Sequence, residues 1–207
     1  MSVTASDLTA YARIRNAALE GFARDGVAAT SIRDVAKAAG VSHSLVQHHF
    51  SSKAALVRAI NDYVIAIATD AFSEPPDDGW PTDIVKELGD RLTAFVRDYP
   101  IALLYVARST ADGDEAAMGI FDAFFAIARA QWQAVADRGL LYPDTDLDWM
   151  ALHIVVFNLG TVLLADAISR HLPKPFFSAE QLDRWNRAST TLVSRGTYRA
   201  ESEVRQS

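Results

Sequence analysis

The stretch Thr30-Ser-Ile-Arg-Asp-Val-Ala-Lys-Ala-Ala-Gly-Val-Ser-His-Ser-Leu-Val-Gln-His-His-Phe-Ser-Ser-Lys53 predicts two short helices joined at a glycine. Ser31 is placed to cap the first helix, and Gly40 can adopt the left-handed conformation that ends it. Ala36 allows the two helices to approach closely. The residues that would close the small core between them are Val41, Leu45 and Val46. These are the requirements of a helix-turn-helix, although an αα-hairpin in a helical bundle shares them.

The second helix of such a motif enters the DNA major groove with its N-terminal residues toward the base edges. The residues expected on its exposed side can all donate or accept hydrogen bonds, and they are Ser42, His43, Ser44, Gln47 and His48. Gln47 could read adenine or contact phosphate, and the sequence leaves both open. Free backbone N–H groups at helix starts favour phosphate. The expected phosphate contacts are Thr30, Ser31, Arg33 and Lys53.

The charge of the chain is unevenly distributed. The net charge of all 207 residues is −6, which by itself argues against a nucleic-acid partner. Residues 1–60, however, carry seven Lys or Arg and four acids, a net charge of +3, which leaves −9 on the remaining residues. A basic module on an acidic body suits a protein that touches a polyanion with one end only.

Composition indicates a folded protein of a reducing compartment. Half of the residues are apolar and 22% are charged, and there is no cysteine, which excludes disulfides and thiolate chemistry. Residues 1–9 lack the layout of a signal peptide. Residues 149–168 are long enough to span a bilayer but include four polar or charged side chains, so we interpret them as a buried helix. The sequence therefore predicts a cytoplasmic protein without membrane contact.

Apolar residues recur at helical spacing in nearly every segment, without strict alternation, so the predicted fold is all-α. The pattern predicts helices over about 9–24, 31–40, 42–50 and 51–72, then a Pro- and Gly-rich loop over 73–81. Further helices are expected over 82–99, 101–111, 114–138, 146–171 and 179–195, the last with Ser178 and Gln181 spaced as a capping box. We predict a helix-turn-helix domain of three helices over 1–52, joined through the long fourth helix to a larger helical domain over 53–207.

The helix-turn-helix run resembles the DNA-binding domain of TetR-type transcriptional regulators. The matching positions are Thr30-Ser31, Ala36-Lys-Ala-Ala39-Gly40-Val41-Ser42, His49-Phe50 and Ser52-Lys53-Ala-Ala-Leu56, all in register. The chain departs from the family pattern at Ser44, where Gly is common, and at Gln47, where a Tyr commonly touches the phosphate backbone. That phosphate contact is therefore not carried over to Gln47. The resemblance covers about residues 9–60.

The resemblance implies a homodimeric repressor that binds a palindromic double-stranded DNA operator. It also implies that the C-terminal domain dimerises and binds a small-molecule effector that lowers operator affinity, with no cofactor. The alternative is a DNA-binding regulator whose C-terminal domain is a protein-interaction module without a ligand. A third hypothesis, a helical-bundle enzyme or binding protein without DNA contact, finds no support in sequence motifs: there is no paired-histidine metal motif, phosphate loop or nucleophile elbow. We therefore expect neither catalysis nor a metal site.

Candidates for the effector site are aromatic or polar residues on otherwise apolar faces, although the same aromatics are typical of plain core. They are Phe95, Tyr99, Tyr105, Arg108, Phe121, Phe124, Phe125, Trp132, His153, Phe157 and Asn158. His153 and Asn158 would each need a partner if buried, either in the core or on a ligand. Arg108 could pair with an acidic effector or with a local acid such as Asp112.

Residues 149–168 are apolar on nearly every face, and such a helix must be covered on every face. Its own domain would cover one side and a second copy of the chain the other. The last helix would complete the interface, unless it docks on its own domain instead. The expected dimer contacts are Leu159, Gly160, Leu163, Leu182, Trp185 and Leu192.

Overall fold

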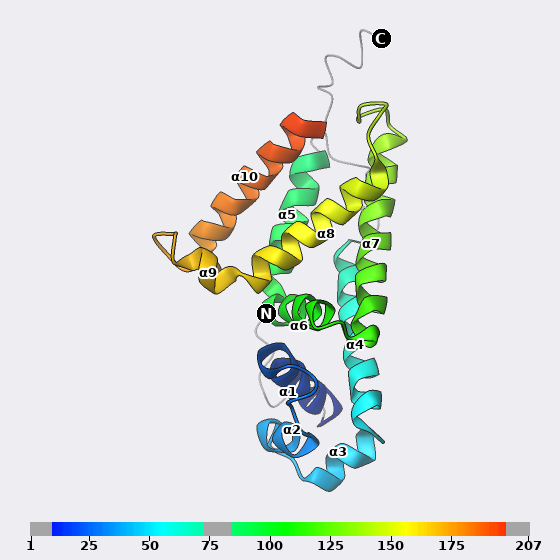
Figure 1. Cartoon of the computed structure of the whole chain (residues 1–207), viewed down its shortest axis with the longest axis vertical. Coiled ribbons are helices and arrows are strands. Elements are labelled where there is room, and N and C mark those ends of the chain that lie inside the picture. Colours follow the sequence, from blue (N-terminus) through cyan, green and yellow to red (C-terminus); the bar gives the residue numbers. More distant parts are fainter. Residues whose placement is uncertain (1–9, 73–83, 198–207) are drawn as a thin grey trace. The chain divides into compact units, whose positions relative to one another are not determined.

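The computed structural model describes residues 10–72 and 84–197, and these form helices linked by short turns (Figure 1). The helices are α1 (Ala10–Asp25), α2 (Ile32–Ala39), α3 (His43–His49), α4 (Lys53–Ala71), α5 (Ile84–Asp98), α6 (Pro100–Ala111), α7 (Glu115–Ala136), α8 (Leu147–Leu163), α9 (Ala165–Ser169) and α10 (Ala179–Thr197). No strand occurs in the described residues, so the all-α prediction is confirmed. The predicted loop over 73–81 lies outside them.

The chain divides into two compact units. The described part of unit 1 comprises residues 10–66 and 101–121, and that of unit 2 comprises 67–72, 84–100 and 122–197. Unit 1 therefore contains α6 in addition to the three N-terminal helices and most of α4. The two units are defined by packing, whereas the predicted boundary between residues 52 and 53 separates a DNA-binding from a ligand-binding domain. That boundary stays a prediction.

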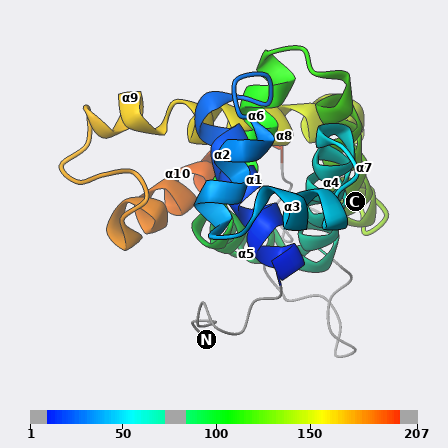
Figure 2. The same ribbon diagram turned by 90° about the horizontal axis from the view of Figure 1, so that it is seen from below.

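Unit 1 is built around buried apolar side chains of α1 to α4. Figure 2 shows α1, α2 and α3 lying next to one another. The side chains with no exposed surface are Ile14, Ala18, Phe22, Val46, Leu56, Ile60 and Val64. α6 joins this core through Tyr105, which is fully buried and whose hydroxyl donates to Asn61 Oδ1 at 2.7 Å. Burial raises the pKa of Tyr105. Unit 1 thus combines local helix packing with one segment from later in the chain.

Unit 2 has its own core, formed where α5, α7 and α8 meet. Its buried members are Ile84, Val85, Trp132, Val135, Leu141 and Ala151. α10 packs along α5 at Gly89, where a Cβ atom would lie only 2.6 Å from Thr190 Oγ1 and 2.8 Å from Asn186 Oδ1. The Asn186 amide also donates to Asp90 at 2.6 Å. The absence of a side chain at Gly89 therefore lets the two helices approach.

The single helix predicted over 146–171 is wrong, because α8 ends at Leu163 and the short α9 follows. The break lies at Leu164, whose ψ of 12° departs from helical geometry and whose side chain is 56% exposed. Apolar residues continue across the break, so hydrophobic spacing contains no stop signal there. After α9 the chain turns back, with Ser169 Oγ accepting from the N–H of Phe176 at 2.9 Å.

The capping box predicted at Ser178 and Gln181 is also wrong. The N–H of Gln181 and the N–H of Leu182 both donate to the backbone carbonyl of Ser178, each at 3.0 Å. The Ser178 hydroxyl is buried without a hydrogen-bond partner among the described residues. The residue types of a capping box are present, but the backbone carbonyl of Ser178 takes the Gln181 N–H that the side chain would have bound.

Candidate DNA-binding surface

The helix α2 starts with a capping box. Ser31 has an extended backbone, and its Oγ accepts a hydrogen bond from the N–H of Asp34 at 3.2 Å. In return, the Asp34 carboxylate accepts from the Ser31 N–H at 3.2 Å and from the Ser31 hydroxyl at 2.5 Å. These hydrogen bonds lower the pKa of Asp34. The predicted cap at Ser31 is confirmed; sequence reasoning missed Asp34, although an acid three residues after the cap is the relevant signal.

The turn between α2 and α3 is made by Gly40 in the left-handed region, with φ 65° and ψ 38°. The N–H of Val41 donates to the Ala36 carbonyl at 3.0 Å, and the N–H of Gly40 to the Lys37 carbonyl at 3.2 Å. These bonds satisfy carbonyls that the end of α2 leaves free. α3 begins directly afterwards, because Ser42 Oγ caps it by accepting from the N–H of Leu45 at 3.2 Å. The result is a helix-turn-helix with both helix starts capped.

Replacing Gly40 by alanine is expected to lower the free energy of unfolding by about 1–2 kcal/mol. No atom lies within 4 Å of the position that a Cβ would take, so the cost is backbone strain rather than a clash. Urea denaturation followed by circular dichroism measures it. Gly119→Ala is the matched control, since Gly119 lies inside α7 with equally open surroundings and alanine favours helix there. An unchanged stability for Gly40→Ala would contradict the argument.

The two sides of α3 differ sharply in exposure. Val46 is fully buried, Leu45 and His49 are half-buried, and Phe50 at the C-terminal end is 4% exposed. The Phe50 ring lies 4.7 Å from the ring of Tyr11 on α1, which fixes the end of the helix. The residues on the opposite, exposed side are Ser42, His43, Ser44, Gln47 and His48. The structure therefore brings together all five residues that were predicted to face the groove.

The predicted phosphate contacts divide into two groups. Arg33 is exposed on the first turn of α2, and Ser31 is exposed but bonded to Asp34. Thr30 is buried and its hydroxyl donates to the Gly26 carbonyl at 3.0 Å. Lys53 is half-buried, and its ammonium donates to the Ala28 carbonyl at 3.3 Å. Of the two cations among these four residues, Arg33 has no internal partner among the described residues, whereas Lys53 has one. The phosphate contacts stay predictions.

Residues 14–60 match the family model described as bacterial regulatory proteins, tetR family. This segment contains α2, the turn at Gly40 and α3. The chain belongs to the TetR family. The family is defined by regulatory proteins rather than by a catalysed reaction, which agrees with the prediction that the chain is not an enzyme.

Two curated relatives are named as HTH-type transcriptional regulators. The HTH-type transcriptional regulatory protein RaaS of Mycobacterium tuberculosis (strain H37Rv) is 33% identical over 139 residues, which are 67% of this chain and 58% of RaaS. An HTH-type transcriptional repressor of the same strain is 37% identical over 98 residues, which are 45% of this chain and 50% of the repressor. The TetR-family chain therefore spans little more than half the length of the curated relatives that it matches.

A solved structure supports the fold along most of the chain. It is described as a gamma-butyrolactone receptor (ArpA like protein), and it superposes with a TM-score of 0.70 at 18% sequence identity. The superposition covers 91% of this chain and 88% of the receptor. The helical fold of the TetR-family chain is therefore shared beyond the helix-turn-helix.

The predicted effector contacts are distributed over both compact units. Tyr105, Arg108 and Phe121 belong to unit 1, whereas the other eight belong to unit 2. Arg108 donates to the carbonyl of Arg24 at the end of α1 and lies 4.0 Å from Asp112, the local acid that was considered. Tyr105 and Arg108 of this TetR-family chain thus have partners within unit 1, and the assignment of all three residues as ligand contacts stays a prediction.

Within unit 2 the remaining candidates separate into three groups. Phe95 lies 5.2 Å from Tyr99 and 6.4 Å from Phe124, ring to ring. Trp132 is part of the buried core, with Phe125 packed against it. His153 and Phe157 are exposed on α8, where His153 lies 5.5 Å from the Trp149 ring. All of these assignments as ligand contacts stay predictions.

Asn158 is the remaining candidate, on the buried side of α8. It is 5% exposed, and its amide donates to the Ile154 carbonyl at 2.6 Å. Its Oδ1 is buried without a hydrogen-bond partner among the described residues. An unpaired buried acceptor costs on the order of 1–3 kcal/mol, so this oxygen favours a bound donor.

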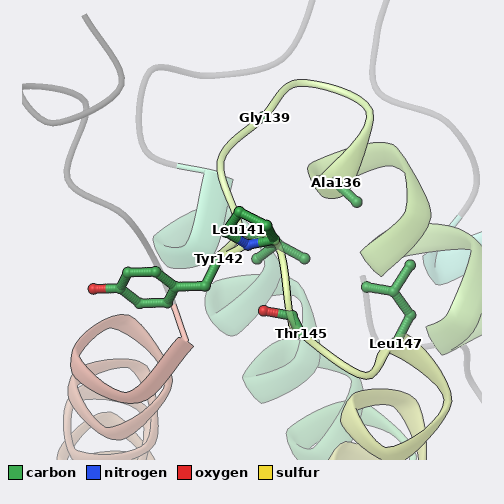
Figure 3. A pocket seen from close by; sticks show the side chains of 7 residues that line it. Ala136, Gly139, Leu141, Tyr142, Thr145 and Leu147 are labelled. Carbon is green, nitrogen blue, oxygen red and sulfur yellow. The ribbon is translucent and has the colours of Figure 1, made fainter. Parts of the chain in front are cut away.

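A cavity of about 330 Å³ lies at the connection between α7 and α8 (Figure 3). It is lined by Ala136, Gly139, Leu141, Tyr142, Pro143, Thr145 and Leu147, none of which was predicted as a ligand contact. Figure 3 shows the Tyr142 ring pointing away from the Leu147 side chain. Thr145 contributes the one polar side chain apart from the tyrosine hydroxyl, so this hollow offers little to orient a polar ligand.

Within residues 10–72 and 84–197, no helix combines the length and the apolar character needed to cross a lipid bilayer. The same part of the chain contains no group of three or more His, Cys, Asp or Glu side chains that could hold a metal ion.

Proposed function

We propose that this TetR-family chain is a homodimeric, DNA-binding transcriptional repressor that acts in the cytoplasm on a palindromic operator. The observation that carries the proposal is the row of five exposed polar side chains formed by Ser42, which caps α3, and four residues of α3. The opposite side of this helix packs in the core of unit 1. Because α3 follows a capped turn, its N-terminal half is presented as the groove helix of a helix-turn-helix requires. The repressor named among the curated relatives supports the sign of regulation.

The proposed operator contacts fall into two roles. Gln47 and His43 are exposed and would face base edges, where an amide can bind adenine in bidentate fashion. Arg33 is exposed on the first turn of α2 and would bind phosphate, which fixes position but carries no sequence information. Specificity is thus assigned to α3 and general affinity to α2.

Dimerisation is proposed through one face of α8. Apolar side chains line this face although they are exposed on the single chain: Trp149 (59%), Val156 (57%) and Leu163 (40%), followed directly after the helix by Leu164 (56%). At Gly160, no atom lies within 4 Å of the position of a Cβ, so a second backbone can approach there. On α10, Leu192 is 69% exposed, whereas Leu182 is buried within its own chain. Such a stripe on a soluble protein indicates a partner surface, and a palindrome requires two copies.

A small-molecule effector of unit 2 is proposed as the releasing signal. The unpaired Oδ1 of Asn158 supports it, and so does the overall likeness to a protein described as a gamma-butyrolactone receptor. The second candidate is a regulator whose unit 2 binds a protein and no small molecule. The compact apolar core around Trp132 favours that alternative. Thermal denaturation against a compound panel separates the two, because only an effector that binds the folded state raises the melting temperature.

The proposal is tested by selecting bound duplexes from a random pool and measuring their affinities for variants. Arg33→Ala is expected to weaken every duplex alike and to reduce the slope of log affinity against log salt by about 1. Gln47→Ala is expected to change the ranking of duplexes, with about 1–3 kcal/mol lost at one base position. Arg170→Ala, exposed in unit 2, is the matched control for charge. If no duplex is enriched at low salt, the proposed DNA binding is wrong.

A further inference from the structure

The helix proposed to enter the groove carries no residue with a permanent charge. Its sequence, His-Ser-Leu-Val-Gln-His-His, contains no Lys, Arg, Asp or Glu, so its three ionisable groups are imidazoles. His43 and His48 are exposed on the side of α3 that faces away from the core. His49 is half-buried, with its ring 6.1 Å from Tyr11 and 6.4 Å from Phe50. The charge of this surface is therefore set by protonation.

The charged groups on the neighbouring elements do not pair with these imidazoles. α2 presents Arg33, Lys37 and Asp34, and the Asp34 carboxylate is held by Ser31. At the start of α4, the Lys53 ammonium is bonded to the Ala28 carbonyl, and α1 contributes the Tyr11 ring. Among the described residues, no carboxylate forms an ion pair with His43 or His48 within 4.0 Å. Both rings are thus available to an external anion.

We propose that DNA binding by this chain takes up protons at His43 and His48, so that operator affinity rises as the pH falls. The inference rests on the proposed function of α3 as the groove helix. An imidazole ordinarily gains its charge near pH 6.5, and the phosphates of DNA favour the charged form. Protonation is therefore more favourable in the complex than in the free protein. The extra affinity is fully present at a pH low enough for the imidazoles to be charged even in the free protein. It is lost as the pH rises until the imidazoles are neutral in the complex as well.

The size of the effect follows from the number of imidazoles that gain a proton. Each imidazole whose pKa rises by one unit on binding changes the affinity about tenfold across the titration. His48 lies 5.3 Å from His49, ring to ring, so a charge on one opposes a charge on the other. One proton is therefore expected at that end of α3 and one at His43. The affinity should rise by up to about a hundredfold between pH 8.5 and pH 5.5.

The experiment measures the affinity of a duplex enriched from the random pool by fluorescence anisotropy between pH 5.5 and 8.5 at constant ionic strength. The parent chain is compared with the H43Q/H48Q double variant, in which glutamine keeps hydrogen bonding but cannot take up a proton. H171Q, which removes an exposed imidazole of unit 2, is the matched control. Calorimetry in two buffers of different ionisation enthalpy counts the protons directly, and circular dichroism at each pH checks that all three proteins stay folded.

The parent chain and H171Q are expected to bind more tightly at pH 5.5. Near pH 7, binding is expected to take up about half a proton at each of the two sites, or about one proton in total. The affinity of the double variant at pH 5.5 is expected to exceed its affinity at pH 8.5 by much less than in the parent. This holds whatever the affinity of the double variant at pH 8.5. An equal ratio in the parent and the double variant, or a flat profile in the parent, overturns the inference and leaves DNA binding intact. Failure to bind any duplex at any pH overturns the proposed function itself.

Discussion

The Val156→Asp variant is expected to be a monomer that binds the operator on the order of a hundredfold more weakly than the parent dimer. Val156 is 57% exposed on the single chain, in the middle of the apolar stripe on α8. A two-fold interface on this stripe would bury the side chain twice, once from each copy. A buried unpaired carboxylate costs several kcal/mol, so two of them are expected to prevent association. Each separate chain then binds one half-site of the operator and lacks the gain in affinity that comes from joining two DNA-binding domains in one dimer.

Size-exclusion chromatography with light scattering measures the oligomeric state, and anisotropy on the enriched duplex measures the affinity. Ala126→Asp is the matched control, because Ala126 is exposed on α7 and away from the stripe. The thermal melting of Val156→Asp should show a folded chain, since the position is exposed in the single copy. A dimeric Val156→Asp variant with parent affinity would show that this face of α8 is not the interface.

Replacing Phe22 by alanine is expected to lower the free energy of unfolding by about 3–5 kcal/mol. The Phe22 side chain has no exposed surface, and its ring lies 6.4 Å from the ring of Tyr105. Truncation leaves a cavity between α1 and α6 that rigid helices cannot close. A whole domain is stable by only about 5–15 kcal/mol. Unit 1 should therefore unfold at a much lower denaturant concentration in the variant than in the parent.

Chemical denaturation followed by circular dichroism measures this loss. Ile101→Ala is the control in the same unit, because Ile101 is 41% exposed and its truncation should change stability by less than about 1 kcal/mol. Hydrogen exchange adds a local readout: amides of α6 should lose protection together with those of α1. A loss below about 1 kcal/mol for Phe22→Ala would contradict the packing described for unit 1.

The helix-turn-helix was predictable because its determinants are local. The cap at Ser31, the turn at Gly40 and the apolar spacing of α2 and α3 all lie within one stretch of sequence. Most predicted helix ends within the described residues lie within two residues of the observed ones for the same reason, as for α6, predicted over 101–111 and observed over Pro100–Ala111. The exposed side of α3 followed directly from the helical period.

The prediction failed or stayed open where distant segments decide the outcome. Arg108 meets the carbonyl of Arg24 across 84 positions, and Tyr105 meets Asn61 across 44. No local pattern indicates that α6 packs with the N-terminal helices. His153 and Phe157 are exposed, which the sequence did not indicate because an all-apolar helix conceals which side faces out. The end of α8 was missed because Leu164 breaks the helix through one dihedral angle and not through its residue type.

The close approach at Gly89 links the identities of residues far apart in the chain. Asp90 and Asn186 are 96 positions apart, and a side chain at position 89 would press on the Asn186 side chain that donates to Asp90. In an alignment of true relatives, glycine at position 89 should covary with Asn or Thr at positions 186 and 190. A library that randomises α10 alone should therefore recover small residues opposite Gly89, which makes this pair of helices a single unit for directed evolution.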